Sequence, residues 1–174
     1  NGFRLLFLNG EYGPGIWNTP SRIWYWNDPQ SFFVIRLAAI LDIFTFSSYS
    51  ATAVLFAVIA FVGGWMFFLT FYKLYPDLHR WVAFAILFIP SVVFWGSGIF
   101  KDTITLSALG VATFAFHRVF IQQRVKVGSI MLLLFSLWVM FSIKKYILLC
   151  FLPALLFWAV ASYLARISSL MLRA

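Results

Sequence analysis

The chain has 174 residues, of which 63% are hydrophobic and only 10% charged, and its formal net charge is +8. A soluble domain is roughly 45–50% apolar and about 25% charged, so an ordinary water-soluble protein is excluded. The 22 Phe, 8 Trp and 7 Tyr exclude a disordered chain, and the single cysteine, Cys150, excludes a disulfide framework and a cysteine-based zinc site. We therefore predict an all-α, polytopic membrane protein with about five transmembrane helices and an N-terminal interfacial helix.

Residues 1–30 are predicted to form an aromatic-rich loop. The Gly-Pro-Gly sequence at 13–15 and the prolines Pro20 and Pro29 prevent a long helix. The Trp and Tyr residues of this stretch are typical of a membrane–water interface, and a binding loop is the alternative. The first residue is Asn1 rather than Met, so we expect the chain to be a piece of a longer protein.

Residues 31–48 are apolar but contain Arg36 and Asp42. Each charge would cost about 2.5–3.5 kcal/mol at the centre of a bilayer, which favours a helix lying in the interface. The alternative is a membrane span that pairs these charges with other residues. The two side chains are six positions apart, about 240° around a helix, so they cannot pair with each other on one face.

Five uncharged runs follow, and each is predicted to cross the membrane. They cover residues 51–72, 81–100, 103–116, 127–143 and 146–165. The third run has only 14 residues, so its helix must continue past His117 and Arg118, with the Arg118 side chain reaching the headgroups. Pro90 is expected to break the second run, and the Gly63-Gly64 pair in the first predicts close helix packing.

The basic residues of the loops predict the orientation. With five spans, seven Lys or Arg fall on one side and three on the other, so the seven-positive side is expected in the cytoplasm. The seven are Lys73, Arg80, Arg118, Arg124, Lys126, Arg166 and Arg173, and the three are Lys101, Lys144 and Lys145. Residues 1–48 are then an extracytoplasmic loop and interfacial helix, and residues 49–174 a transmembrane domain. The basic residues stand singly or in pairs between apolar runs, so no nucleic-acid partner is expected.

Two short turns on the extracytoplasmic side carry the candidate ligand-binding residues. Asp102, or Ser97, is a plausible N-cap for the third span, and Lys101 adds a positive charge there. Lys144 and Lys145 join the last two spans, and adjacent ammonium groups attract an anion. We predict that Lys101, Asp102, Lys144 and Lys145 form a site for a phosphorylated ligand, with a capped turn and ordinary lipid headgroups as the alternative.

Glu11 and Asp28 are the candidate catalytic residues, because either carboxylate could accept the proton of an attacking hydroxyl. Ordinary loop acids are the alternative interpretation. His79 and His117 are 38 positions apart without helical metal-ligand spacing, so no metal site is expected, and no motif names a cofactor.

Three strings carry a resemblance to a known group. They are FxxFYKLYPDLH at 68–79, IPSVVFWGSGIFKDTITL at 89–106 and IKKYILLCFLPALL at 143–156. They resemble polytopic envelope proteins of Bacteroidetes-type bacteria, which are described as membrane glycosyltransferases or polysaccharide polymerases with distant similarity to the glycosyltransferase-C superfamily. The resemblance covers about two thirds of the chain, and FWGSGIFKD is its most specific element.

The resemblance implies a multi-pass protein of the bacterial inner (cytoplasmic) membrane that uses a polyprenyl-phosphate-linked sugar on the extracytoplasmic face. In that superfamily the first external loop carries interfacial helices and an acidic catalytic residue near its start, so residues 1–48 correspond to the later part of that loop. Glu11 and Asp28 do not match the acidic motif, and members have more than five spans. If the chain is a fragment, the catalytic acid is expected upstream of Asn1.

Two functional hypotheses follow from these observations. The first is a membrane-embedded glycosyl-transfer or polysaccharide-assembly module that uses a lipid-phosphate-linked donor. The second is a non-catalytic membrane scaffold subunit that binds lipid and other membrane subunits. A transporter is less favoured, because transporters bury ionisable residues at mid-depth and the five runs have none in their centres.

Overall fold

The computed structural model describes residues 28–46 and 48–171, with the side chains of Pro29 and residues 165–171 excepted. Across these ranges the chain is all helical and contains no strand, as predicted. The α-helices are α2 (Pro29–Thr45), α3 (Tyr49–Leu74), α4 (His79–Ala83), α5 (Pro90–Gly96), α6 (Lys101–Phe116), α7 (Val127–Ile143) and α8 (Lys145–Met171). A 3-10 turn, η2 (Pro76–Leu78), and two π-helical segments, η3 (Phe84–Phe88) and η4 (His117–Ile121), complete the order.

Three helices are long and apolar enough to cross a bilayer, which indicates a multi-pass membrane protein. They are α3, the continuous helix Lys101–Ile121 formed by α6 and η4, and Lys145–Leu164 of α8. The segments Pro76–Phe88 and Pro90–Gly96 make a fourth candidate if the bent pair counts as one span. The remaining predicted span, α7, has 17 residues and is about 25 Å long, which is short for the roughly 30 Å hydrocarbon layer.

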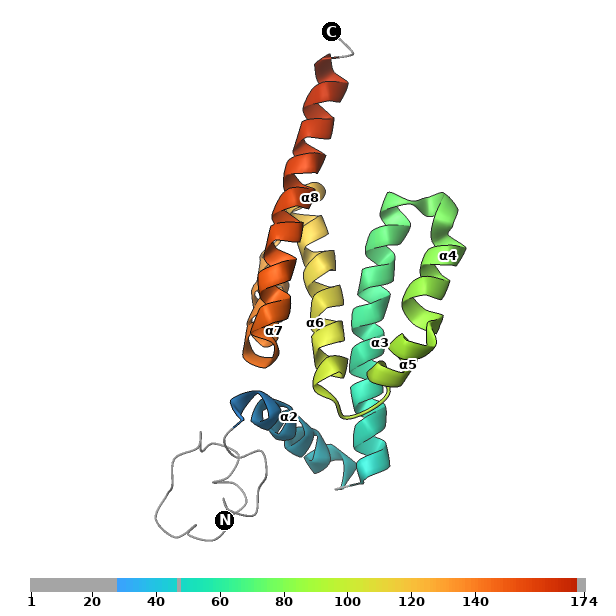
Figure 1. The fold of residues 1–174 in the computed structure, drawn as a ribbon, viewed down its shortest axis with the longest axis vertical. Coiled ribbons are helices and arrows are strands. Elements are labelled where there is room, and N and C mark those ends of the chain that lie inside the picture. The colour runs from blue at the N-terminus through green and yellow to red at the C-terminus, as the bar shows by residue number, and fades with distance from the viewer. Residues whose placement is uncertain (1–27, 47, 172–174) are drawn as a thin grey trace.

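The helices run alternately up and down (Figure 1), and α2 crosses one end of the bundle. That end also carries the α5–α6 loop and the α7–α8 turn, and we call it the ion-pair end for the contacts described below. The α3–α4 connection and the η4–α7 loop lie at the opposite end. The loops therefore fall into the same two groups that the sequence predicted.

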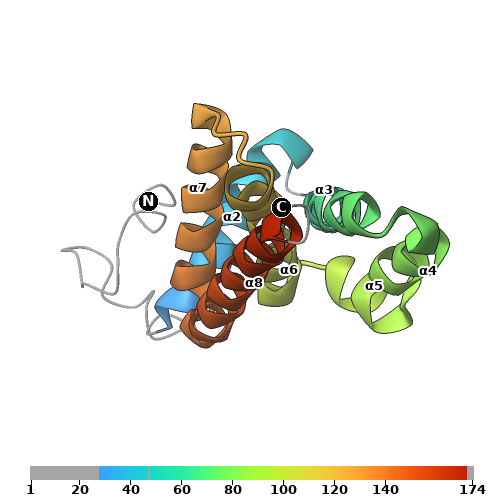
Figure 2. The same cartoon turned by 90° about the horizontal axis from the view of Figure 1, so that it is seen from above.

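Helix α6 is the central helix of the bundle. Buried residues make up 56% of the most apolar 18 residues of the continuous helix Lys101–Ile121, against 22% in α3 and 6% in α8. Seen from above, it lies between α7 and α3, with the bent segment on the outer flank of α3 (Figure 2). The two most extensive helix contacts, those with α3 and α7, are therefore both made by α6.

The contact between α3 and α6 is backbone against backbone. A Cβ added to Gly110 would lie 2.1 Å from the carbonyl oxygen of Gly63, and one added to Gly63 would lie 2.3 Å from the Cα of Ser107. The Ser107 hydroxyl donates a 2.8 Å hydrogen bond to the carbonyl of Ile59 across the same contact. Only glycine leaves room for this approach, so the predicted close packing at Gly63 is confirmed.

The predicted break at Pro90 is also confirmed. The helix axes before and after Ile89 differ by 45°. Ile89 has the extended backbone (φ −64°, ψ 126°) that is favoured before a proline, and Pro90 has no N–H to continue the preceding helix. The π-helical segment η3 comes directly before this break, as irregular turns do where helical hydrogen bonding is interrupted.

The ends of two helices differ from, or refine, the sequence prediction. Helix α2 begins at Pro29, two residues earlier than expected, because Asp28 caps it. The predicted continuation of the third span past His117 and Arg118 is confirmed by η4, which carries the helix to Ile121.

Replacement of Gly110 by alanine is expected to destabilise the protein by about 1–3 kcal/mol, because the new methyl group overlaps the backbone of α3. Gly128→Ala is the matched control, since a Cβ at that helical position meets nothing within 4 Å. Its expected effect is neutral or stabilising by less than about 1 kcal/mol. Thermal unfolding in detergent compares the two variants, and equal melting temperatures would contradict the close contact.

Candidate functional site

Two ion pairs lie at the ion-pair end, and we call their four residues the ion-pair cluster: Asp28, Lys101, Asp102 and Lys144. The Lys101 Nζ lies 2.9 Å from Asp28 Oδ2, and the Lys144 Nζ pairs with Asp102 Oδ1. Lys101 and Asp102 are consecutive at the start of α6. The cluster therefore joins the N-terminus of α2, the N-terminus of α6 and the α7–α8 turn.

Asp28 has a structural role in this arrangement. Its carboxylate accepts hydrogen bonds from the Gln30 backbone N–H (3.0 Å) and the Ser31 hydroxyl (2.6 Å), as well as from Lys101. The hydrogen bond from Ser31 and the charge of Lys101 hold the pKa of Asp28 well below its ordinary value. A carboxylate stabilised in this way is a weak proton acceptor, which counts against Asp28 as a general base.

Lys144 is the more enclosed of the two paired lysines, with 17% of its side chain exposed against 32% for Lys101. Burial alone would lower its pKa. The hydrogen bond and charge of Asp102, with a contribution from Tyr146, outweigh burial and raise the pKa of Lys144 above its ordinary value. Lys144 is therefore protonated at neutral pH and places a positive charge in the α7–α8 turn.

Lys145, a further predicted site residue, lies outside the cluster. Lys145 is exposed, and its Nζ lies 5.1 Å from the centroid of the Phe141 ring, at cation–π distance. Glu11 falls outside the described residues. Of the six predicted site residues, four thus form two ion pairs, which the consecutive residues Lys101 and Asp102 join through the backbone.

The prediction that Asp102 or Ser97 caps α6 is wrong. The N-cap residue is Phe100, which provides no side-chain hydrogen bond, and Asp102 points instead to Lys144. The Ser97 hydroxyl donates to the carbonyl of Phe94. The turn is held by a residue that the sequence reasoning passed over, Thr103, whose hydroxyl lies 2.8 and 2.7 Å from the carbonyl oxygens of Trp95 and Gly98.

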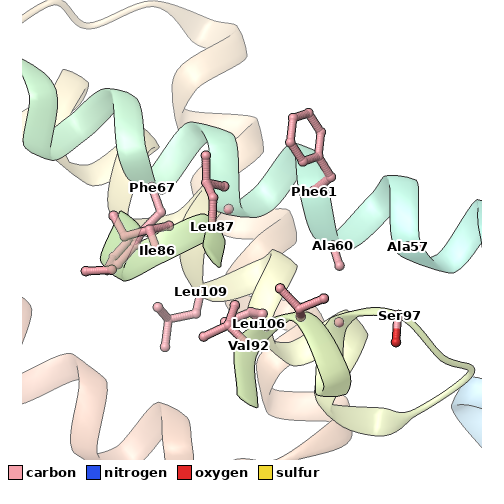
Figure 3. A pocket seen from close by; sticks show the side chains of 14 residues that line it. Ala57, Ala60, Phe61, Phe67, Ile86, Leu87, Val92, Ser97, Leu106 and Leu109 are labelled. Atoms are coloured by element: carbon pink, nitrogen blue, oxygen red, sulfur yellow. The ribbon is translucent and has the colours of Figure 1, made fainter. Parts of the chain in front are cut away.

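An apolar groove of about 400 Å³ lies between α3, the bent segment and α6 (Figure 3). Its walls are almost entirely hydrocarbon, and small residues such as Ala57, Ala60 and Gly64 make the room. Ser97 lies at the edge of the groove nearest the α5–α6 loop. A groove of this character, set among membrane-spanning helices, suits a lipid chain.

A second cavity, of about 380 Å³, adjoins the groove on the α8 side of α6 and shares part of its lining. Asp102 of the ion-pair cluster is one of its walls, together with the half-exposed ring of Trp95. Its lining residues are Ser91, Val92, Trp95, Asp102, Thr105, Leu106, Leu109 and Ile147. No periodicity or motif in the sequence predicts this cavity, because it depends on how the bent α5 sits against α6.

The two histidines lie toward the opposite end. His79 begins α4 and is exposed, whereas His117 is 3% exposed and its ring stacks on Trp158 at a centroid distance of 5.8 Å. Lys73 and Arg118 both lie over the ring of Phe114, at 5.7 and 5.5 Å. Across the described part of the chain, no group of three or more His, Cys, Asp or Glu side chains could hold a metal ion.

Comparison with protein-family models, with curated proteins and with solved structures finds no match. The function therefore has to be argued from the geometry of the ion-pair cluster and the two adjoining cavities.

The charge of Asp28 predicts a pH-dependent stability. Because folding lowers the pKa of Asp28, its contribution is complete above the unfolded carboxyl value of about 3.9 and is lost as pH falls below it. Asp28→Asn keeps a good N-cap residue and removes only the charge. The variant is expected to melt roughly 1–3 °C below wild type at pH 7, because a partly exposed pair contributes about 0–1 kcal/mol.

This difference is expected to shrink as the pH falls from about 4 toward 2, measured by thermal unfolding. Asp77→Asn is the control, since Asp77 is exposed at the opposite end and makes no described ion pair. A difference between wild type and Asp28→Asn that stays constant down to about pH 2 would contradict the assignment.

Proposed function

We propose that this multi-pass membrane protein binds a lipid-phosphate-linked ligand at the ion-pair end and acts as a module of glycosyl transfer or polysaccharide assembly. The ligand's phosphate is held by Lys101 and Lys144, with Lys145 beside them, and its hydrocarbon chain occupies the groove between α3 and the bent segment. The expected ligand is a polyprenyl-phosphate-linked sugar.

The observation that carries the proposal is the ion pair between Lys144 and Asp102 at the wall of a cavity that adjoins an apolar groove, with Lys101 next to Asp102 in the chain. Lys101 and Lys144 are 43 positions apart in sequence, yet both are tied to Asp102. Lys101 directly precedes Asp102 in the chain, and Lys144 forms an ion pair with it. The cavity that Asp102 lines shares residues with the groove. A charged head and an apolar chain on one molecule match this combination.

A phosphate can replace Asp28 and Asp102 as the partner of the two lysines. Two lysines and two aspartates sum to zero charge, and the exposed Lys145 adds one positive charge nearby. A phosphate that bridges the lysines would release Asp28 and Asp102 to water, which both side chains already reach, being 41% and 42% exposed. Lysine serves as a point-charge phosphate ligand, so the exchange needs no fixed planar geometry.

The orientation that we propose puts the ion-pair end outside the cytoplasm of a bacterial inner membrane. The bent segment and α7 then count as spans, which gives five passes with α2 in the interface. This assignment leaves the more basic end, with Lys73, Arg118 and Arg124, in the cytoplasm. A lipid-phosphate-linked donor would then reach the site from the outer leaflet of the membrane.

A non-catalytic scaffold subunit is the second candidate, and one observation favours it. Both Lys101 and Lys144 already hold a carboxylate, so the cluster also closes one end of the bundle without any ligand. The large apolar surface of α8 would then contact other membrane subunits rather than lipid.

Lys144→Gln is expected to weaken binding of polyprenyl phosphate by about tenfold, because it removes one charge-assisted contact of about 1.5 kcal/mol. The measurement uses the full chain in lipid nanodiscs and titrates polyprenyl phosphate by native mass spectrometry. The double variant Lys101→Gln, Lys144→Gln is expected to abolish measurable binding.

Lys73→Gln is the matched control, a lysine at the other end of the bundle that lies over an aromatic ring. It is expected to bind within about twofold of wild type. Equal affinity for all three variants would contradict the phosphate site. Absence of binding by wild type, with co-purification of other membrane proteins at fixed stoichiometry, would establish the scaffold alternative.

A further inference from the structure

Three described carboxylates lie near the ion-pair end, and their surroundings differ. Asp28 caps α2 and accepts from three donors. Asp42 Oδ1 accepts hydrogen bonds from the hydroxyls of Thr45 and Thr52 at the α2–α3 corner. Asp102 has one described partner, Lys144, on Oδ1 alone. Its Oδ2 has no hydrogen-bond partner among the described residues.

Of these three carboxylates, Asp102 is the one that lines either of the two cavities described above. The cavity of about 380 Å³ falls in the range of roughly 300–1,000 Å³ that small-molecule sites occupy, so it can hold a sugar ring. The carboxylate reaches it from the first turn of α6, and 42% of its side chain is exposed. A ligand entering from the ion-pair end would therefore meet Asp102 directly.

The rest of the cavity suits a hydroxyl-bearing ring. The Trp95 ring is 48% exposed, and edge contacts with Phe94 (5.3 Å) and Phe100 (5.7 Å) support it. An indole held in this way offers a flat apolar surface of the kind on which the C–H face of a sugar packs. The Thr105 hydroxyl donates to the carbonyl of Lys101, which leaves its oxygen able to accept a hydrogen bond from a ligand.

We propose that Asp102 is the carboxylate that receives the proton of the acceptor hydroxyl, and that the cavity beside Trp95 holds the acceptor. This inference rests on the proposed function, since it needs a lipid-phosphate-linked sugar as donor. It moves the general base away from Glu11 and Asp28 to a residue that the sequence suggested only for binding.

The transfer step balances with these groups. The acceptor oxygen forms a bond to the anomeric carbon of the donor sugar, and the bond between that carbon and the phosphate oxygen breaks. The hydroxyl proton passes to Asp102 Oδ2, and the bond electrons leave with the lipid phosphate. Lys101 and Lys144 offset the charge that the departing phosphate gains. Binding of the phosphate to Lys144 also frees Asp102 Oδ1 from its ion pair.

The test compares Asp102→Asn with wild type in nanodiscs, with a polyprenyl-phosphate-linked hexose as donor and octyl glucoside as acceptor. Asparagine keeps the size of the side chain but cannot take the proton. Transfer is expected to fall at least a hundredfold, the usual contribution of a general base, while binding of polyprenyl phosphate changes less than about threefold. The residual rate is expected to lose its decline at low pH, a change that a purely structural role would not produce.

Asp77→Asn, at the opposite end, is the control for removal of a carboxylate and is expected to keep the wild-type rate. Transfer by Asp102→Asn above a tenth of wild type overturns the inference, and so does loss of transfer in Asp28→Asn alone. A wild-type protein that binds polyprenyl phosphate but transfers no hexose overturns this inference and leaves the phosphate site standing. A wild-type protein that does not bind polyprenyl phosphate overturns both.

Discussion

The backbone contact between α3 and α6 is the constraint on which the other features depend. Gly63 and Gly110 let the two helices approach until a carbonyl oxygen fills the space of a missing side chain. Within a bilayer, apolar burial drives helix association only weakly, so dispersion contacts of this kind decide which helices pair. The contact fixes α6 at the centre, and the positions of its N-terminal charges follow. A looser pairing would move Lys101 and Asp102 away from α2 and the α7–α8 turn.

The ion pair between Asp102 and Lys144 lies at the end of the bundle, where it costs less free energy than it would at mid-depth. At mid-depth a paired charge would still carry a large desolvation cost, whereas at the ion-pair end both side chains retain some contact with water. The pair ties the start of α6 to the start of α8, two elements that share little other packing. It can therefore hold the turn in place and also open to an anion, because a partly exposed ion pair contributes only about 0–1 kcal/mol.

The sequence predicted the helices well because the membrane allows few alternatives. The run 127–143 matches α7 residue for residue, and the break at Pro90 and the extension past Arg118 were foreseen from hydrogen bonding and length. The cap of α6 was predicted wrongly. Local preference favours Asp102 as the N-cap, but its carboxylate forms an ion pair with Lys144, more than forty positions away. The cavity beside Trp95 was not predictable, since it depends on the 45° bend and not on any one residue.

The 45° bend before Pro90 also shapes two adjoining spaces, the apolar groove and the cavity lined by Asp102. A straight helix in place of the bent segment would pack along α3 and α6 and leave no room at Ala60 and Gly64. With the bend, residues of α5 and α6 line both the groove among the spans and the second cavity beside Asp102. A ligand with a long chain and a charged head spans both spaces in one pose. The irregularity at Pro90 thus links the position of the hydrocarbon groove to the position of the carboxylate.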